Sequence, residues 1–503
     1  MFKEISSEWN KTIISLAIVL SLLLSIYVLS DPVGSSKLLF KTYDSLATFF
    51  EPTYMYGSFG VLIFLIFIAL SKYGEIEISL RNKETYSLFS WGSMLFAAGI
   101  GAALLYWATV EWVEYFNILK TQNLDLDRVL LYSRTYPVFH WSFTAWAIYC
   151  LPAIAFGLAI TINQKSKLTF SGIFNINNKF LEVIFDSLFI GAILCGAGVG
   201  LGLSFPLISS ILSNIFNIER TINLDIFTIA VCLSIFATSA YLGIQKGIKR
   251  LSNFNIILVF TFLFIVFILG PTQYIFSKSI ESYVFLFEEY GELSFSTGTI
   301  ISKDWTVFYW AWWMALAPMV GAFIVNISNG KSLRSIILGV IFIGSIGCMV
   351  SMSILSNLSI YLFESGLLNA PTLLEDDALT REQIIIKTLS ALNYSNYLLI
   401  GFGVICIIFL CTTYDSTSYI LASASMKGSN LESSGNLRLI FAILLVIQPT
   451  LLMFLGGVDS FKWIMVIFSV PLLLIYLLLM ITVVKNINVI TKKIGPSSLD
   501  KGA

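Results

Sequence analysis

Long apolar stretches recur along the whole chain, and the short segments between them carry most of the charged residues. A helix needs about 20 consecutive apolar residues to cross the hydrocarbon core of a bilayer. Stretches of about that length with little or no charge occur at residues 12–30, 54–71, 88–110, 137–162, 187–212, 226–244, 254–275, 306–327, 336–358, 397–422, 439–455 and 463–484. The pattern predicts an all-α integral membrane protein with about 12 transmembrane helices.

The composition agrees with this prediction and argues against several classes of function. Of the 503 residues, 57% are hydrophobic and 12% are charged, whereas a soluble protein carries about 25% charged residues. Thirty basic residues balance thirty acidic ones, so no net field recruits polyanions. We therefore expect neither a soluble enzyme, nor a disordered scaffold, nor a partner for nucleic acid.

Few side chains are available for metal binding or acid–base chemistry. The six cysteines fall inside apolar stretches without metal-ligand spacing, and His140 is the only histidine. Disulfides, structural zinc and an imidazole cluster are therefore not expected. We predict that the protein is not an enzyme and has no resident cofactor.

Basic residues alternate between the segments that connect the apolar stretches. The even-numbered connections are basic, as at Lys246, Lys249 and Arg250, whereas the odd-numbered ones are mixed or acidic, as at Glu288 and Glu289. Cytoplasmic loops carry the excess of lysine and arginine in membrane proteins. We expect a multi-pass protein of the cell (inner or plasma) membrane, with both termini in the cytoplasm and membrane lipid as its surroundings.

Two of the apolar stretches contain runs of small residues or proline near their middle. The third includes residues 97–103 (AAGIGAA), and the eighth includes residues 314–321 (MALAPMVG). Such runs permit a helix to unwind where freed backbone groups face a cavity or an ion. They also permit close helix packing. Because the two runs lie five stretches apart, we favour unwinding in both, within a five-plus-five inverted repeat.

This repeat defines the expected organisation of the chain. The predicted parts are two N-terminal transmembrane helices with a cytoplasmic loop (1–86), a first repeat (87–275), an extracytoplasmic surface helix (276–303), a second repeat (304–484) and a short cytoplasmic tail (485–503).

Aromatic residues are concentrated in the fourth and eighth stretches. Trp310 and Trp313 share one face of the eighth helix, and three further aromatic residues fall within one arc of the fourth. The three are Trp141, Trp146 and Tyr149. In a dry cavity, a cation over such a ring face gains about 2 kcal/mol or more. Convergent rings therefore predict a site for a trimethylammonium group, which cannot donate hydrogen bonds.

The same residues carry a family resemblance. The segment 304–313 (DWTVFYWAWW) resembles the signature of the betaine/choline/carnitine transporter (BCCT) family at every position. The segments 105–111 (LYWATVE), 140–149 (HWSFTAWAIY) and 246–253 (KGIKRLSN) also match, so the resemblance covers nearly the whole chain. It implies a LeuT-like fold, transport by alternating access and assembly as a homotrimer.

The resemblance also implies a substrate site. Trp141, Trp146, Tyr149 and Trp313 would form an aromatic box, and Trp310 and Trp312 would line the permeation path or lie behind the box. Several relatives carry a further tryptophan where this chain has Leu316, which places a second aromatic contact on the path in doubt.

The tenth stretch contains residues that could hold a coupling ion. A dehydrated Na⁺ prefers several hard oxygens, which hydroxyls and unwound carbonyls supply without a carboxylate. Thr412 and Thr413 offer two adjacent hydroxyls. The resemblance implies that the backbone carbonyls of Ala97, Ile100 and Phe409 complete the site.

Asp415 is a carboxylate inside the tenth stretch. Burying it is costly unless it is paired, so a functional role is expected. A structural hydrogen bond beside the ion site is our first interpretation, and proton coupling is its rival.

The distribution of carboxylates bears on the substrate. No Asp or Glu occurs in residues 91–110, where Ala103 holds a natural position for one. A zwitterion brings its own counter-charge to a dry site. We therefore expect sodium symport of a quaternary-ammonium zwitterion of the glycine betaine type. The alternatives are a sodium-independent exchanger of carnitine or betaine, and proton-coupled uptake of choline or dimethylsulfoniopropionate.

Overall fold

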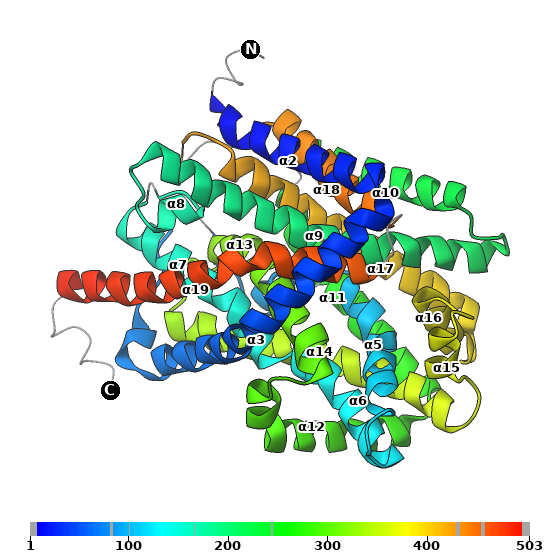
Figure 1. Cartoon of the computed structure of the whole chain (residues 1–503). Coiled ribbons are helices and arrows are strands. Elements are labelled where there is room, and N and C mark those ends of the chain that lie inside the picture. The colour runs from blue at the N-terminus through cyan, green and yellow to red at the C-terminus, as the bar shows by residue number, and fades with distance from the viewer. Residues whose placement is uncertain are drawn as a thin grey trace.

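The computed structural model describes residues 8–80, 84–99, 101–164, 166–242, 245–428, 433–453 and 458–494. Within these ranges the chain forms helices and no β-strand, and the helices pack into one bundle (Figure 1). The helices that build the bundle are α2 (Lys11–Ser30), α3 (Pro32–Leu70), α4 (Leu88–Gly99), α5 (Ala103–Leu119), α6 (Leu126–His140), α7 (Phe143–Ile162), α9 (Lys179–Phe216), α10 (Ile222–Leu242), α11 (Gln245–Leu269), α13 (Val307–Ile327), α14 (Leu333–Glu364), α17 (Ser395–Ala424), α18 (Gly435–Met453) and α19 (Val458–Ile494).

Within the described residues, each of the twelve apolar stretches lies mainly on helices of this bundle. In the described part of the chain, nine helices are long and apolar enough to cross a membrane. Three shorter apolar segments, Lys11–Leu23, Leu88–Ala97 and Gly435–Ile447, account for the remaining three stretches. The predicted all-α, multi-pass fold is therefore confirmed.

The two longest connections between spans form helices of their own. The first connection forms α12 (Thr272–Phe295), whose Phe276, Val284 and Phe287 are exposed. The second forms α15 (Ala370–Glu375) and α16 (Arg381–Ser390). Figure 1 shows α12 at the edge of the molecule and α15 and α16 together beside the end of α17.

The helices begin and end where local chemistry requires it. Asp31 separates α2 from α3, and its side chain accepts a hydrogen bond from the Gly34 amide at 2.9 Å. Pro32 takes the first helical position, where its missing N–H costs nothing. The second predicted stretch thus becomes a helix of 39 residues that starts well before its apolar core.

The third predicted stretch is broken, as the sequence indicates. Helix α4 ends at Gly99 and α5 begins at Ala103. Between them, Gly101 has a φ of 52°, which is in the left-handed region that favours glycine. The two helices therefore meet at an unwound segment inside the bundle.

The eighth predicted stretch is not broken, and the expected interruption at residues 314–321 is wrong. Helix α13 runs continuously from Val307 to Ile327, with Pro318 inside it. A Cβ atom at Gly321 would lie 2.8 Å from Pro152 Cβ and 2.9 Å from the Ala153 backbone nitrogen. The small residues thus allow α13 to pack closely against α7, which was the alternative reading of that run. The five-plus-five inverted repeat itself stays a prediction.

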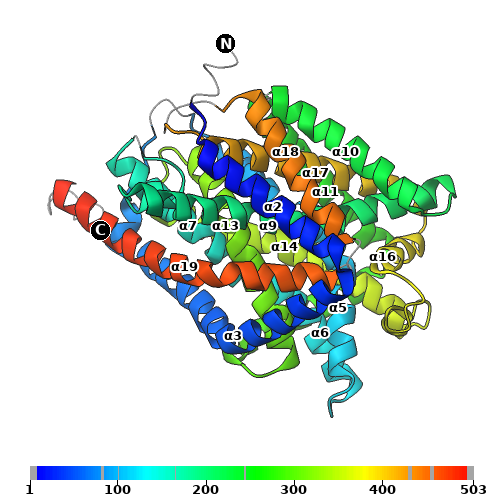
Figure 2. The ribbon, with the colours of Figure 1, turned by 45° about the horizontal axis from the view of Figure 1, so that its top comes forward.

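Among the candidate spans in the described ranges, the one that contains α13 is the most enclosed. In this span, 94% of the most apolar 18-residue segment is buried inside the protein. It packs against α7, α9 and α19, and the second view shows α7, α9 and α13 together inside the bundle (Figure 2). Side chains on α13 are therefore placed in the interior of the protein and away from lipid.

The close contact of α7 with α13 predicts a sharp response to a single methyl group. Gly321→Ala places a Cβ against backbone and proline atoms that cannot move aside, so we expect a loss of about 1–3 kcal/mol in stability. The measurement is the temperature at which detergent-solubilised protein loses its monodisperse state. Gly60→Ala in α3 is the matched control, because no atom lies within 4 Å of the added methyl and alanine favours helix. Equal midpoints for Gly321→Ala and the wild type would contradict this packing.

Candidate functional site

A cavity lies where the break between α4 and α5 faces α7, α9, α13 and α17. The free volume of the cavity, measured with a water-sized sphere, is about 40 Å³. This is enough for a few water molecules. The cavity is lined by Gly99, Gly101, Ala102, Ala103, Trp141, Tyr149, Gly196, Ala197, Gly200, Ser204, Trp312, Trp313, Leu316, Met319, Thr413 and Tyr414. The wall consists of small residues on one side and large aromatic rings on the other.

The aromatic rings converge on Trp313. Its ring centroid lies 4.5 Å from that of Tyr149, 5.5 Å from that of Trp141 and 6.0 Å from that of Trp146. The four rings meet at interplanar angles of 55–87° and not as parallel stacks. The structure thus brings the four predicted residues together as a cluster, which we call the aromatic box.

The secondary structure places these rings from two directions. Trp141 follows the last residue of α6, and the chain turns there before α7 begins at Phe143. Trp146 and Tyr149 then lie one turn apart on α7, opposite Trp312 and Trp313 of α13. Because α7 and α13 pack so closely, the rings have no room to turn outward.

The predicted residues differ in their distance from the cavity. Trp312 lines it, and its Nε1–H donates to the Gly196 carbonyl of α9 at 2.9 Å. Trp146 touches Trp313 and Tyr149 but stands behind them, stacked on Phe96. Ala103 and Leu316 line the cavity directly.

Trp310 lies apart from the cavity wall. Its ring packs edge-on against Phe139 and His140, with centroids 5.5 Å and 5.8 Å away. Since it is buried against α6, Trp310 supports the outer part of the box and does not line the cavity.

Glu111 is a residue of the site whose role the sequence reasoning missed. It is fully buried on α5, where its Oε2 accepts a hydrogen bond from Trp141 Nε1–H at 2.9 Å and its Oε1 accepts one from the Tyr115 hydroxyl at 2.6 Å. The Glu111 carboxylate therefore fixes the orientation of the Trp141 indole through its Nε1–H group. The available signal was the single acidic residue that closes the 105–111 motif, immediately after the acid-free segment.

His140 extends this network toward α13. Its Nδ1 lies 2.8 Å from the Tyr115 hydroxyl, and its Nε2 lies 2.9 Å from the Thr306 hydroxyl. Since Tyr115 donates its proton to Glu111, the Nδ1–H of His140 donates to Tyr115. The histidine has a partner on each ring nitrogen and stacks on Tyr309 at 4.7 Å, so its role is to fix α6 against α13.

Of the residues predicted to hold an ion, the structure places Thr413 at the break in the third stretch. Thr413 lies on the cavity wall, and among the described residues its buried Oγ1 has no hydrogen-bond partner. This oxygen is the atom nearest to where a Cβ of Gly101 would stand, at 3.4 Å. Thr412 Oγ1 lies 3.0 Å from the carbonyl oxygens of Ile408 and Phe409. Ala97 is buried near the end of α4, and Ile100 lies outside the described residues.

Asp415 lies one turn further along α17. Its Oδ2 accepts a hydrogen bond from the Ser239 hydroxyl of α10 at 3.0 Å, and its side chain is half-buried. The carboxylate therefore joins α17 to α10. Among the described residues, no group of three histidine, cysteine or acidic side chains could hold a metal ion.

Comparisons with known proteins assign the chain to a family. The family model described as BCCT, betaine/carnitine/choline family transporter, matches residues 12–491. A carnitine transporter of Acinetobacter baumannii is 28% identical over 448 residues, which cover 86% of this chain and 80% of that protein. An ectoine/hydroxyectoine transporter of Virgibacillus pantothenticus is 28% identical over 452 residues, which cover 88% of this chain and 89% of that protein.

The family match extends over nearly the whole described structure, including the box and the broken third stretch. A transport role follows from it. The chain therefore belongs to the betaine/carnitine/choline transporter (BCCT) family and is a multi-pass membrane transporter.

Proposed function

We propose that the protein imports a quaternary-ammonium zwitterion of the glycine betaine type by symport with Na⁺. The observation that carries the proposal is the position of the aromatic box, which shares a cavity with the start of helix α5. The box suits the onium end of the substrate, and the start of α5 suits its carboxylate end.

The box offers ring faces in a site from which water is largely excluded. A methylated onium ion spreads its charge over methyl groups that rings can surround, and cation–π attraction strengthens when the cation is desolvated. The Nε1–H groups of Trp141 and Trp312 are bound to Glu111 and Gly196, so these rings are fixed before a substrate arrives. With Trp313 and Tyr149 only 4.5 Å apart, the box must widen to admit the onium group.

The other end of the cavity suits an anion. Gly101, Ala102 and Ala103 line it, and the first N–H groups of α5 have no partner within their own helix. A helix N-terminus carries partial positive charge and binds carboxylates. A substrate that joins an onium group to a carboxylate would thus span the cavity from the box to α5.

Glu111 changes the charge balance expected from the sequence alone. Its carboxylate stands directly behind Trp141 and adds to the attraction for the onium group. Carnitine, the substrate in the name of one relative, is also a trimethylammonium zwitterion. The preference for a zwitterion therefore depends on carboxylate binding at the N-terminus of α5 as much as on onium binding in the aromatic box.

The arrangement around Thr413 supports sodium as the coupling ion. Among the described residues the buried Thr413 hydroxyl has no hydrogen-bond partner, and it lies next to Gly101. The Thr412 hydroxyl donates to the Phe409 carbonyl at 3.0 Å, so these two oxygens already lie close together on the same helix. Hard oxygens of this kind suit Na⁺. An ion there would also lie close to the end of the cavity assigned to the substrate carboxylate, which couples the two binding events.

Proton coupling through Asp415 is the second candidate, because Asp415 lies on α17 one turn from these threonines. Uptake in proteoliposomes separates the candidates. A sodium gradient drives uptake if the proposal is right, a proton gradient alone drives it if Asp415 couples transport, and counterflow without either gradient indicates an exchanger.

Removing the π-system of Trp313 tests the box. Trp313→Leu keeps an apolar side chain but removes the ring face, so we expect the affinity for radiolabelled glycine betaine to fall about 30-fold or more, which corresponds to about 2 kcal/mol. Trp313→Phe is the matched control and should retain most of the affinity. Equal affinities of the leucine and phenylalanine variants would refute cation–π binding at this position.

The ion site is tested by exchanging one hydroxyl for a methyl group. Thr413→Val keeps the shape of the side chain, and we expect the sodium concentration for half-maximal uptake to rise about 10-fold or more, since a bond to a charged group contributes about 1.5–3 kcal/mol. Thr413→Ser retains the hydroxyl and should behave like the wild type. Normal sodium dependence of the valine variant would exclude Thr413 as a ligand.

Glu111→Gln tests the charge behind the box. At a separation of about 8 Å and an effective dielectric constant of about 20, a carboxylate stabilises a cation by about 2 kcal/mol. We expect the affinities for glycine betaine and for choline both to fall by about 10-fold or more, because both carry the onium group. Unchanged affinities, measured by equilibrium binding to purified protein, would limit Glu111 to a structural role.

A further inference from the structure

A second hollow lies on the side of α9 that faces away from the substrate cavity. It is bounded by α2, by α9 and by the first turns of α3 and α19. Its free volume, measured with a water-sized sphere, is about 270 Å³. All of its lining residues except Ser21 and Ser187 are apolar. We call this hollow the α2–α9 groove.

The groove is elongated along two helices. On α2 its wall includes Ile13, Leu16, Ala17 and Leu20, at the spacing of one helical face. The wall on α9 shows the same spacing between residues 187 and 194. Seven residues of α-helix span about 10 Å, so the shape suits a flexible hydrocarbon chain better than a compact ligand.

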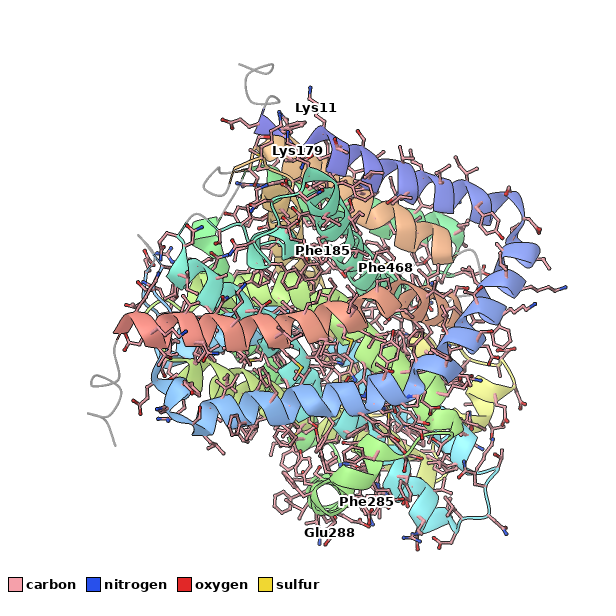
Figure 3. All side chains as sticks on the ribbon, turned by 60° about the vertical axis from the view of Figure 1, so that its left-hand side comes forward. Lys11, Lys179, Phe185, Phe285, Glu288 and Phe468 are labelled. Atoms are coloured by element: carbon pink, nitrogen blue, oxygen red, sulfur yellow. The ribbon has the colours of Figure 1, made fainter. Side chains whose placement is uncertain are left out.

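Glycine gives the groove its depth on α9. A Cβ atom at Gly191 would lie 2.5 Å from the Cζ atom of Phe468, which lines the opposite wall. The tip of the Phe468 ring therefore points at the backbone of α9, in space that any side chain at position 191 would fill. Figure 3 shows Phe468 and Phe185 in the region below α2.

Two lysines stand where these helices begin. Lys11 is the first residue of α2 and Lys179 the first of α9, and Figure 3 shows both labels at the same end of the molecule. Both are exposed, and within the described ranges neither forms an ion pair. Because the basic residues of the even-numbered connections predict a cytoplasmic N-terminus, the start of α2 is expected on the cytoplasmic side.

The acidic residues of the same turns of α9 are already engaged. Glu182 lies 3.3 Å from Lys167 Nζ, and Asp186 accepts hydrogen bonds from the amide and hydroxyl of Ser171 at 3.0 Å and 2.9 Å. Neither carboxylate of α9 is therefore free to neutralise Lys11 or Lys179; on the α2 side, the exposed Glu8 lies three residues before Lys11. A basic pair beside an apolar groove between transmembrane helices is complementary to an anionic lipid.

We propose that the α2–α9 groove binds one acyl chain of an anionic phospholipid of the cytoplasmic leaflet, with the phosphate headgroup between Lys11 and Lys179. The lipid would fill the gap that α2 leaves when it packs on α9. It would also reach the back of the substrate site, because Cys195 lines the groove while the next residue, Gly196, lines the cavity and accepts the hydrogen bond of Trp312.

The test is lipid retention by the full-length purified protein. The protein is incubated in detergent with equal amounts of phosphatidylglycerol and phosphatidylcholine that carry the same acyl chains, and native mass spectrometry counts the lipids that remain. We expect the wild type to retain one phosphatidylglycerol per chain in preference to phosphatidylcholine. Retention of no lipid, or of both lipids equally, would overturn the proposal.

Two kinds of variant separate the groove from the headgroup site. Ala17→Phe fills the groove and should abolish retention, whereas Val19→Phe on the outward face of α2, where Val19 is 48% exposed, should not. Lys11→Gln and Lys179→Gln should each lower the preference for phosphatidylglycerol about 5-fold, as expected for one lysine near an anionic surface. Lys37→Gln on α3, which removes another exposed lysine, should leave it unchanged.

Each alternative outcome counts against the proposal. Wild-type lipid retention in Ala17→Phe would exclude the groove as the lipid site. An unchanged preference for phosphatidylglycerol in a variant that combines Lys11→Gln with Lys179→Gln would exclude the headgroup contact. Should Ala17→Phe fail to remain monodisperse, the lysine variants still decide, because they change exposed side chains and no packing.

Discussion

The close packing of α7 against α13 is the constraint on which the rest of the site depends. It is possible because Gly321 brings α13 within contact of Pro152 and Ala153, where any side chain would collide. This packing turns Trp313 toward Trp146 and Tyr149 and leaves the rings no route to lipid. The box is thus a consequence of how two spans approach one another, and its polar edges are then fixed by Glu111 and by the Gly196 carbonyl.

Much of this could be predicted from the sequence because a bilayer imposes strong rules. A span must be long, apolar and helical, so the twelve stretches identify the helices with only their ends in error. The run of small residues at 97–103 correctly predicted the break between α4 and α5, where Gly101 adopts a positive φ. The tryptophan-rich segments gave the members of the box, although which rings face the cavity depends on packing.

The remainder could not be predicted, because one pattern can serve two purposes. Small residues permit either unwinding or close packing, and residues 314–321 use the second option, which depends on what α7 presents to them. Glu111 was visible as an acidic residue in a span, but its partner Trp141 lies 30 residues away and on another helix. The α2–α9 groove likewise depends on α2, α9 and α19, which are distant in sequence.

The most direct test of the central claim compares two ligands that differ in charge and little else. In 3,3-dimethylbutanoate a tert-butyl group replaces the trimethylammonium group of glycine betaine, so both molecules have the same shape and carboxylate. If the rings bind the onium group through its charge, glycine betaine should bind at least about 30-fold more tightly to the purified protein. Equal affinities for the two would contradict the account, because they would show that the aromatic residues recognise only an apolar shape.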